Sequence, residues 1–173
     1  FVLVDTRPCS IICVALAPGT TGIARDGNPD TSMNETGDSQ VRITEARAAS
    51  RDWGRMPVHR RVERLRALRF AIVDRRDEGA AAVSEDANKT RAEALMTDLL
   101  PTLEIMMRNE KLAPQVLAGE SRPGSMVFPH SEAWVTHEPF GAVLVIGPYN
   151  NPFQLTLLPA ATALAAGNAV LIK

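Results

Sequence analysis

Two polar side chains stand at the ends of apolar runs in the last third of the chain. Asn150 comes after residues 141–147, and Lys173 comes after residues 169–172. The uncharged amide of Asn150 has two N–H donors, which could stabilise an oxygen that gains negative charge or could cap a following helix. The ammonium of Lys173 has three donors, which could bind ligand hydroxyls or simply face solvent. The spacing alone leaves both alternatives open for each residue.

The two apolar runs predict parallel strands that are joined by a helix. Residues 141–147 carry no charge, as is typical of a strand that is buried on both faces of a parallel sheet. Residues 153–166 predict a helix, which a Gly-Asn pair ends, and residues 169–172 predict the second strand. Because ligands gather at the carboxyl ends of parallel strands, both polar side chains should lie at one edge of the sheet.

The first half of the chain predicts helices. Asp38 or Ser39 can cap a first helix that runs to about Trp53 and ends at Gly54. Three more helices are expected: one that begins at Pro57, one at residues 76–87 and one at residues 92–117, which Pro101 should either kink or mark as its first turn.

The helix after Pro57 has a clear apolar period. Spacings of 4, 3, 3 and 4 separate the members of one apolar face: Val58, Val62, Leu65, Leu68 and Ile72. Five arginines occupy much of the remaining surface: Arg60, Arg61, Arg64, Arg66 and Arg69. Such a cluster could bind phosphates, but a solvated helix face is the interpretation we favour, so we expect no nucleic-acid partner.

A region rich in glycine and proline separates the helices from the strand–helix–strand segment. Residues 125–128 and 133–137 predict two short strands, in which Trp134 and Val135 could be buried on one face. His130 and His137 lie in this region without a nearby group of cysteines or carboxylates. We therefore expect no metal site.

The composition is that of a globular domain. The 173 residues carry 19 basic and 20 acidic side chains, a net charge of −1, and are 45% hydrophobic. No apolar run is long enough to span a bilayer, so we expect no membrane partner and a cytoplasmic location. Only two cysteines occur, Cys9 and Cys13, which excludes a disulfide scaffold.

Both ends of the chain have unusual features. Residues 1–37 have no clear period and hold both cysteines, so we expect a leader that is disordered or not native, followed by one incomplete domain at residues 38–173. The chain starts with Phe1 and stops directly after an apolar strand. We therefore expect a fragment that is open at both ends, with Met33 as a plausible start.

Three blocks carry a resemblance to a known family: residues 138–141 (EPFG), 146–152 (IGPYNNP) and 165–173 (AAGNAVLIK). In register and order, they resemble the aldehyde dehydrogenase family, and most of all its class 3 branch. The resemblance extends through the helices and covers about residues 38–173. The main departures are Tyr149, where the family usually has tryptophan, and Asn151, where it has an aromatic residue.

The resemblance implies an α/β fold. The chain would supply the N-terminal helices, the start of a Rossmann-like cofactor domain and a short β oligomerisation arm formed by the two short strands. It also implies NAD or NADP as cofactor, a small-molecule aldehyde as substrate, and a homodimer or homotetramer at full length. Neither Cys9 nor Cys13 matches the nucleophilic cysteine, which would lie beyond Lys173, so the isolated chain should be inactive.

The resemblance also implies roles for single residues. The full-length enzyme would oxidise aldehydes to carboxylic acids through a cysteine thiohemiacetal, whose oxyanion Asn150 would stabilise. Lys173 would hold the adenosine ribose hydroxyls. The cofactor groove would be lined, mainly through backbone, by Ile146, Gly147, Pro148, Tyr149 and Asn150. Two alternatives remain: a semialdehyde or acyl-phosphate-reducing relative, and a non-catalytic fragment that serves only association.

Overall fold

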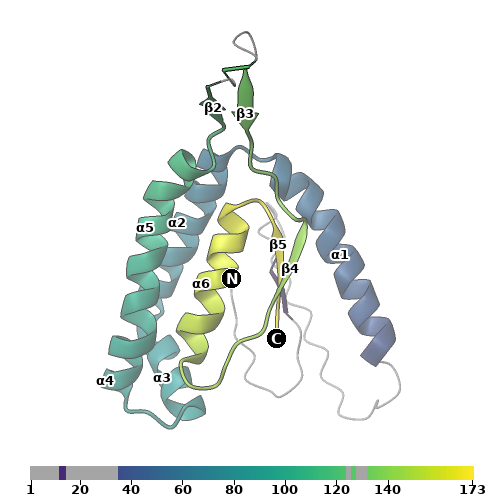
Figure 1. Cartoon of the computed structure of the whole chain (residues 1–173). Helices are drawn as coiled ribbons and strands as arrows, with labels where there is room; N and C mark the ends of the chain where they lie inside the picture. Colours follow the sequence, from purple (N-terminus) through teal and green to yellow (C-terminus); the bar gives the residue numbers. More distant parts are fainter. Residues whose placement is uncertain (1–11, 15–34, 124–125, 128–131) are drawn as a thin grey trace.

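The computed structural model describes residues 12–14, 35–123, 126–127 and 132–173. A small sheet lies between helix α1 on one side and helices α6, α2 and α5 on the other (Figure 1). The helices are α1 (Glu35–Arg55), α2 (Val58–Asp74), α3 (Arg76–Asp86), α4 (Arg91–Ala94), the π-helix η1 (Leu95–Leu99), α5 (Leu100–Val116) and α6 (Pro152–Ala165). The strands are β1 (Ile12–Val14), β2 (Glu120–Arg122), β3 (Ala133–Val135), β4 (Ala142–Val145) and β5 (Ala169–Ile172).

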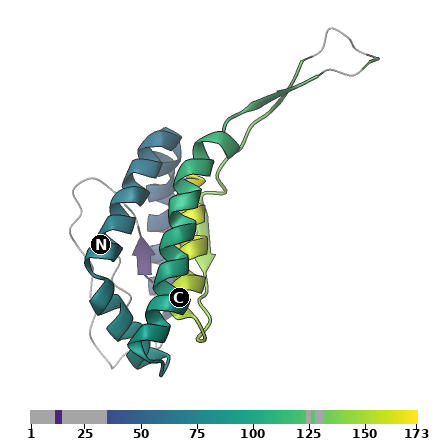
Figure 2. The same ribbon diagram turned by 90° about the vertical axis from the view of Figure 1, so that its left-hand side faces the viewer.

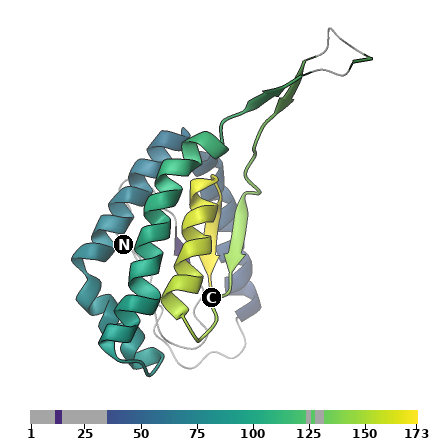
Figure 3. The same cartoon turned by 60° about the vertical axis from the view of Figure 1, so that its left-hand side comes forward.

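The predicted strand–helix–strand unit is confirmed. β4 and β5 pair in parallel, from Ala142 opposite Ala169 to Val145 opposite Ile172, and α6 is the helix that connects them. Figure 3 shows α6 packed alongside the two strands. β5 is the central strand and is almost wholly buried, whereas β4 lies at the edge of the described sheet and Leu144 is half-exposed. The prediction that the first strand is buried on both faces is therefore wrong for this chain.

The other neighbour of β5 is β1, which pairs with it in antiparallel register. β1 falls within the predicted leader, which therefore contributes a strand to the sheet. The remaining leader residues up to 34 lie outside the described residues, and so does Cys9. Helix α1 begins at Glu35, a few residues before the predicted cap at Asp38 or Ser39.

The main core lies between α2, α5 and α6. The apolar period of α2 is confirmed, because Val62, Leu65 and Leu68 are buried in this core and Val58 and Ile72 pack against it. Met106 and Ala113 of α5 belong to the same cluster, and the connecting helix contributes Leu157, Ala160, Ala161, Leu164 and Ala165. Burial of this apolar surface is the main stabilising contribution to the helical layer.

The interpretation of the arginine face is wrong for two residues. Arg61 is buried, and its guanidinium donates to the carbonyl oxygens of Gly54, Met56 and Ala165. Burial lowers the Arg61 pKa. Arg69 makes a two-pronged contact with the buried carboxylate of Glu110, and this hydrogen bond raises the Arg69 pKa. These arginines join elements of the core and do not form a solvated stripe.

The carboxyl end of α6 is held by long-range hydrogen bonds. Trp53 donates its indole N–H to the carbonyl oxygen of Leu164 at 2.8 Å. The buried amide of Asn168 accepts from the Gly141 N–H and donates to the carbonyl oxygen of Ala163. Together with Arg61, these groups satisfy carbonyls that a helix end leaves without partners, and they fix α6 against both strands.

The expectation for Gly54 differs from the structure. Gly54 lies inside α1, which ends at Arg55. A Cβ at residue 54 would come within 3.3 Å of the Gly167 carbonyl oxygen, so the role of this glycine is close packing. Pro101 lies in the first turn of α5, which confirms one of its two predicted alternatives. Proline lacks the N–H that would bond to Thr97, and the preceding π-helix accommodates this, with the Leu100 N–H bonded to Leu95.

The first of the two predicted short strands is misplaced. β2 occupies Glu120–Arg122, whereas Met126 and Val127, within the predicted strand, form a turn. β2 pairs in antiparallel register with β3, and together they form an arm that projects from the helical body (Figure 2). Trp134 on β3 is 65% exposed, so its expected burial does not occur within this chain.

Candidate active site at the carboxyl edge of the sheet

The structure brings the predicted site residues together at one edge of the sheet. The Lys173 N–H donates to the Val145 carbonyl oxygen, and the Gly147 N–H donates to the Lys173 carbonyl oxygen, each at 2.9 Å. The parallel ladder thus continues past the ends of both strands. Ile146 and Tyr149 lie just beyond β4 and are 68% and 91% exposed. Pro148, Asn150 and Lys173 are exposed as well.

Asn150 does not cap the helix that follows it. The N-cap position of α6 belongs to Asn151, and the helix begins at Pro152. Within the described ranges, no hydrogen bond involves the Asn150 amide, and the side chain is exposed at the sheet edge. The amide therefore has both of its N–H donors available to a ligand.

Gly147 marks a close approach of the strand end to α6. A Cβ at this position would lie 1.9 Å from Thr156 Oγ1 and 3.2 Å from Thr156 Cβ. The first distance is far below van der Waals contact and the second is tight, so a side chain at residue 147 would have to displace Thr156 or shift the strand end. The absence of a side chain is thus a requirement of packing at this edge.

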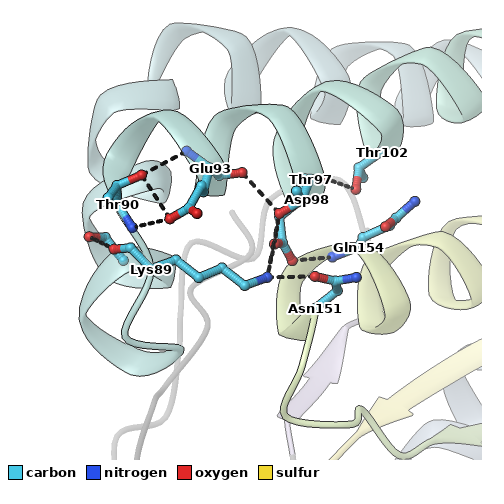
Figure 4. A network of polar contacts seen from close by, with 9 residues as sticks. Lys89, Thr90, Glu93, Thr97, Asp98, Thr102, Asn151 and Gln154 are labelled. Carbon is cyan, nitrogen blue, oxygen red and sulfur yellow. Dashed lines mark hydrogen bonds and ion pairs between the residues drawn. The ribbon is translucent and has the colours of Figure 1, made fainter.

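A polar network includes Asn151, the residue that directly follows Asn150 (Figure 4). Lys89 Nζ donates to Asn151 Oδ1, to Asp98 Oδ2 at 3.0 Å and to Thr97 Oγ1 at 3.4 Å. The Asp98 side chain is 0% exposed, and that of Lys89 is 20% exposed. The other carboxylate oxygen of Asp98 accepts the Gln154 N–H at 3.4 Å.

Asp98 therefore stands in for a helix cap. The Asn151 side chain makes no cap hydrogen bond, because its amide oxygen is bound to Lys89. A carboxylate on η1 instead accepts an N–H from the first turn of α6, where negative charge is also favoured by the helix dipole. The start of α6 is thus fixed from outside the helix.

Lys89 is itself held by its surroundings. Ser84 bonds to the Lys89 backbone at both its N–H and its carbonyl oxygen. The preceding residue, Asn88, has φ of +50°, a conformation that asparagine tolerates better than most side chains. Directly after Lys89, Thr90 and Glu93 form a capping box that starts α4, and these bonds lower the Glu93 pKa.

Sequence reasoning missed the functional interest of this network. Lys89 carries part of the family resemblance, but neither it nor Asp98 stands out by motif or spacing. The one available signal is Asn151 itself, an amide at a position where the family has an aromatic residue. Its partner in the structure is the Lys89 ammonium, 62 residues earlier in the chain.

In the described ranges, no helix has both the length and the apolar character needed to cross a bilayer. Among the same residues, no three His, Cys, Asp or Glu side chains are grouped so that they could hold a metal ion. His130 lies outside the described residues.

Comparison with known proteins gives the family of the chain. Residues 30–173 match the model of the aldehyde dehydrogenase family. The 4,4'-diapolycopene aldehyde oxidase of Methylomonas sp. is 36% identical over 135 residues, which cover 78% of this chain and 26% of that protein. Aldehyde dehydrogenase family 3 member A2 of Mus musculus is 32% identical over 134 residues, or 76% of this chain and 27% of the relative.

A solved structure agrees with the sequence matches. The Mycobacterium tuberculosis aldehyde dehydrogenase complexed with NAD⁺ is similar with a TM-score of 0.69 and 25% identity, over 78% of this chain and 27% of that one. The chain therefore belongs to the aldehyde dehydrogenase family. The family 3 relative confirms the class 3 resemblance, and the solved structure confirms the α/β fold class. The chain spans about a quarter of the length of these relatives.

Proposed function

We propose that the full-length protein oxidises aldehydes to carboxylic acids with NAD or NADP as hydride acceptor. The observation that carries this proposal is the joint exposure of Ile146, residues 148–150 and Lys173 at the carboxyl edge of a parallel strand–helix–strand unit, in a chain of this family. Such an edge is where open α/β sheets bind their ligands. In the reaction, one aldehyde, one oxidised dinucleotide and one water give one acid, one reduced dinucleotide and one proton.

The residues at this edge fit a dinucleotide. Lys173 offers an exposed ammonium to hydroxyl oxygens, and Ile146 and Tyr149 offer exposed apolar surface to a flat ring. When bound, NAD or NADP would supply the acceptor for the hydride that leaves the aldehyde carbon.

Asn150 would act on the aldehyde oxygen. Attack of the nucleophilic cysteine that the family resemblance implies would put negative charge on this oxygen. A neutral amide donates to that oxygen without a charge to desolvate, and a fixed donor needs no reorganisation as the charge develops. Asn150 would thereby lower the barrier to attack.

The first test is turnover by the full-length protein with aliphatic and aromatic aldehydes, measured as reduced dinucleotide and as acid product. We expect equal amounts of both. Production of an acyl phosphate that depends on added phosphate would favour the acyl-phosphate-reducing relative. Absence of turnover in a folded oligomer would favour the association fragment.

Lys173→Ala is expected to raise the KM for the dinucleotide about tenfold and to leave kcat nearly unchanged. The lysine would bind a part of the cofactor that is remote from the hydride, so ground state and transition state would lose the same interaction. Steady-state kinetics of the full-length protein measures this. Lys111→Ala, at an exposed lysine of α5, is the control and should change neither constant. A lower kcat with an unchanged KM would contradict the role of Lys173.

The full-length protein is also proposed to be a homodimer or homotetramer that associates through the β2–β3 arm. The arm projects from the body and exposes Trp134 at 65% and Met126 at 99%. Exposed apolar groups on a projecting hairpin are typical of an interaction surface.

Trp134→Glu is expected to shift the full-length protein toward a smaller species in light scattering. A charge in place of the indole would have to be desolvated in the interface. Met96→Glu, at a comparably exposed apolar residue of η1, is the control and should leave the mass unchanged. An unchanged mass for Trp134→Glu would argue against association through the arm.

A further inference from the structure

We propose that Lys89, Asp98 and Asn151 form a positioning cluster, which holds the turn that carries Asn150 in its working geometry. This inference rests on the proposed role of Asn150 as an oxyanion donor. The three residues come from the α3–α4 connection, from η1 and from the N-cap of α6, and Lys89 bonds to both of the others (Figure 4).

The direct link to Asn150 is its neighbour, Asn151. The Asn151 side chain makes no cap hydrogen bond to α6, and its amide oxygen accepts from Lys89 Nζ. On the other side of the turn, the Gly147 N–H is bound to the Lys173 carbonyl oxygen at 2.9 Å. The turn is thus anchored to the sheet at one end and to the positioning cluster at the other, with Asn150 between the two anchors.

The hydrogen bonds of Lys89 are complete. An ammonium has three protons, and three acceptors surround Nζ: Asn151 Oδ1, Asp98 Oδ2 and Thr97 Oγ1. An ammonium with three fixed acceptors cannot rotate freely. The position of the Asn151 amide is therefore tied to that of the buried Asp98 carboxylate.

Stability alone is a weak reason for this arrangement. Asp98 is wholly buried, and the cost of removing a carboxylate and an ammonium from water offsets much of their attraction. Apolar side chains of similar volume can stabilise such a site as well or better. What a fixed ion pair adds is direction, because each hydrogen bond requires its partner at one place.

Asp98 extends the same control to α6. Its second oxygen accepts the Gln154 N–H at 3.4 Å. One carboxylate therefore positions both the first turn of α6, directly, and the Asn151 amide, through Lys89. An oxyanion donor has its full effect only when it is held in place before the charge develops. The positioning cluster supplies this preorganisation from the helical layer.

The test is a double-mutant cycle in the full-length protein between Asn151→Ala and Asn150→Ala. Asn151→Ala removes the acceptor for Lys89 but leaves the Lys89–Asp98 pair intact, so the fold should be retained. We expect Asn151→Ala to lower kcat about tenfold, with little change in the KM for the dinucleotide, because the donor is misplaced and not removed. In the Asn150→Ala background, the same substitution should change kcat less than about twofold, since no donor remains to be positioned.

A second variant and a control make the cycle specific. Lys89→Met removes the ammonium and should repeat the pattern of Asn151→Ala, with kcat lowered only when Asn150 is present. Asn109→Ala also removes an amide that bonds to α6, at Thr162, far from the turn, and should leave kcat unchanged. Thermal midpoints separate loss of fold from loss of positioning.

Each outcome decides a claim. A costly Asn150→Ala with a silent Asn151→Ala overturns the positioning cluster and leaves the role of Asn150 standing. Equal kcat losses for Asn151→Ala in both backgrounds also overturn it, because the cluster would then act without Asn150. A silent Asn150→Ala overturns both the donor role and the positioning role.

Discussion

Asn150→Ala in the full-length protein is expected to lower kcat by about 10²–10³-fold, the usual effect of losing one oxyanion donor. The substitution removes both N–H groups of an exposed amide at the carboxyl edge of β4. The KM for the dinucleotide should change little, because the interaction with the aldehyde oxygen is made mainly in the transition state. Steady-state kinetics at saturating dinucleotide is the measurement.

The control for this prediction is Asn109→Ala, which removes an amide outside the sheet edge. Both variants should keep a thermal midpoint near that of the native protein, since the Asn150 side chain is exposed and is not the cap of α6. If Asn150→Ala instead lowers the midpoint and spares kcat, the residue has a structural role and the donor role is wrong.

Gly147→Ala is expected to destabilise the protein by about 1–3 kcal/mol, the usual cost of overpacking. The new methyl group would lie 1.9 Å from Thr156 Oγ1, so the end of β4 must move away from α6. This movement should weaken the hydrogen bond from Gly147 to Lys173 and raise the KM for the dinucleotide. Thermal unfolding and steady-state kinetics measure the two effects.

A rescue experiment shows whether Thr156 is the cause. Thr156→Ala removes the oxygen at 1.9 Å and leaves Cβ at 3.2 Å, so the double variant should recover most of the lost stability. Gly119→Ala is the matched control, because a Cβ there would be 3.4 Å from the nearest atom, the Val135 carbonyl oxygen. The same loss with and without the Thr156 hydroxyl would mean that another contact is responsible.

Local patterns predict the parallel strand pair and the apolar face of α2. The second strand has the predicted bounds, because a short apolar run follows a helix end with Gly167 in a left-handed conformation. The apolar face of α2 is confirmed because its spacing matches the helical period. Both signals lie within about 20 residues of the chain, which is the range over which periodicity carries information.

Contacts between distant segments could not be predicted in this way. Arginine is usually a surface residue, yet the Arg61 guanidinium donates to the carbonyl oxygen of Ala165, 104 residues later. The hydrogen bond from Lys89 to Asn151 joins segments that are 62 residues apart. The prediction misplaced β2 because its sequence, Glu-Ser-Arg, has no apolar alternation, and the strand that it pairs with in the described part of the chain, β3, lies further along the chain. In each case the partner is defined by the fold and not by the neighbouring sequence.

The candidate site likewise combines residues that could be predicted from the sequence with contacts that could not. The resemblance predicted which residues meet at the edge, and the ladder from Val145 through Lys173 to Gly147 brings them together. What lies behind the edge could not be predicted, because the buried Asp98 and its partner Lys89 have no motif of their own. Lys89 of this pair donates to the Asn151 amide oxygen, which gives a physical reason for the unusual residue at this position.

The most direct test of the central claim is the kcat of Asn150→Asp in the full-length protein. Asparagine and aspartate have nearly the same shape and are equally good helix caps, but a carboxylate has no N–H to donate and repels a developing negative charge. If Asn150 stabilises the oxyanion, Asn150→Asp will fold normally and lose at least as much kcat as Asn150→Ala. An Asn150→Asp enzyme with native kcat would contradict the account.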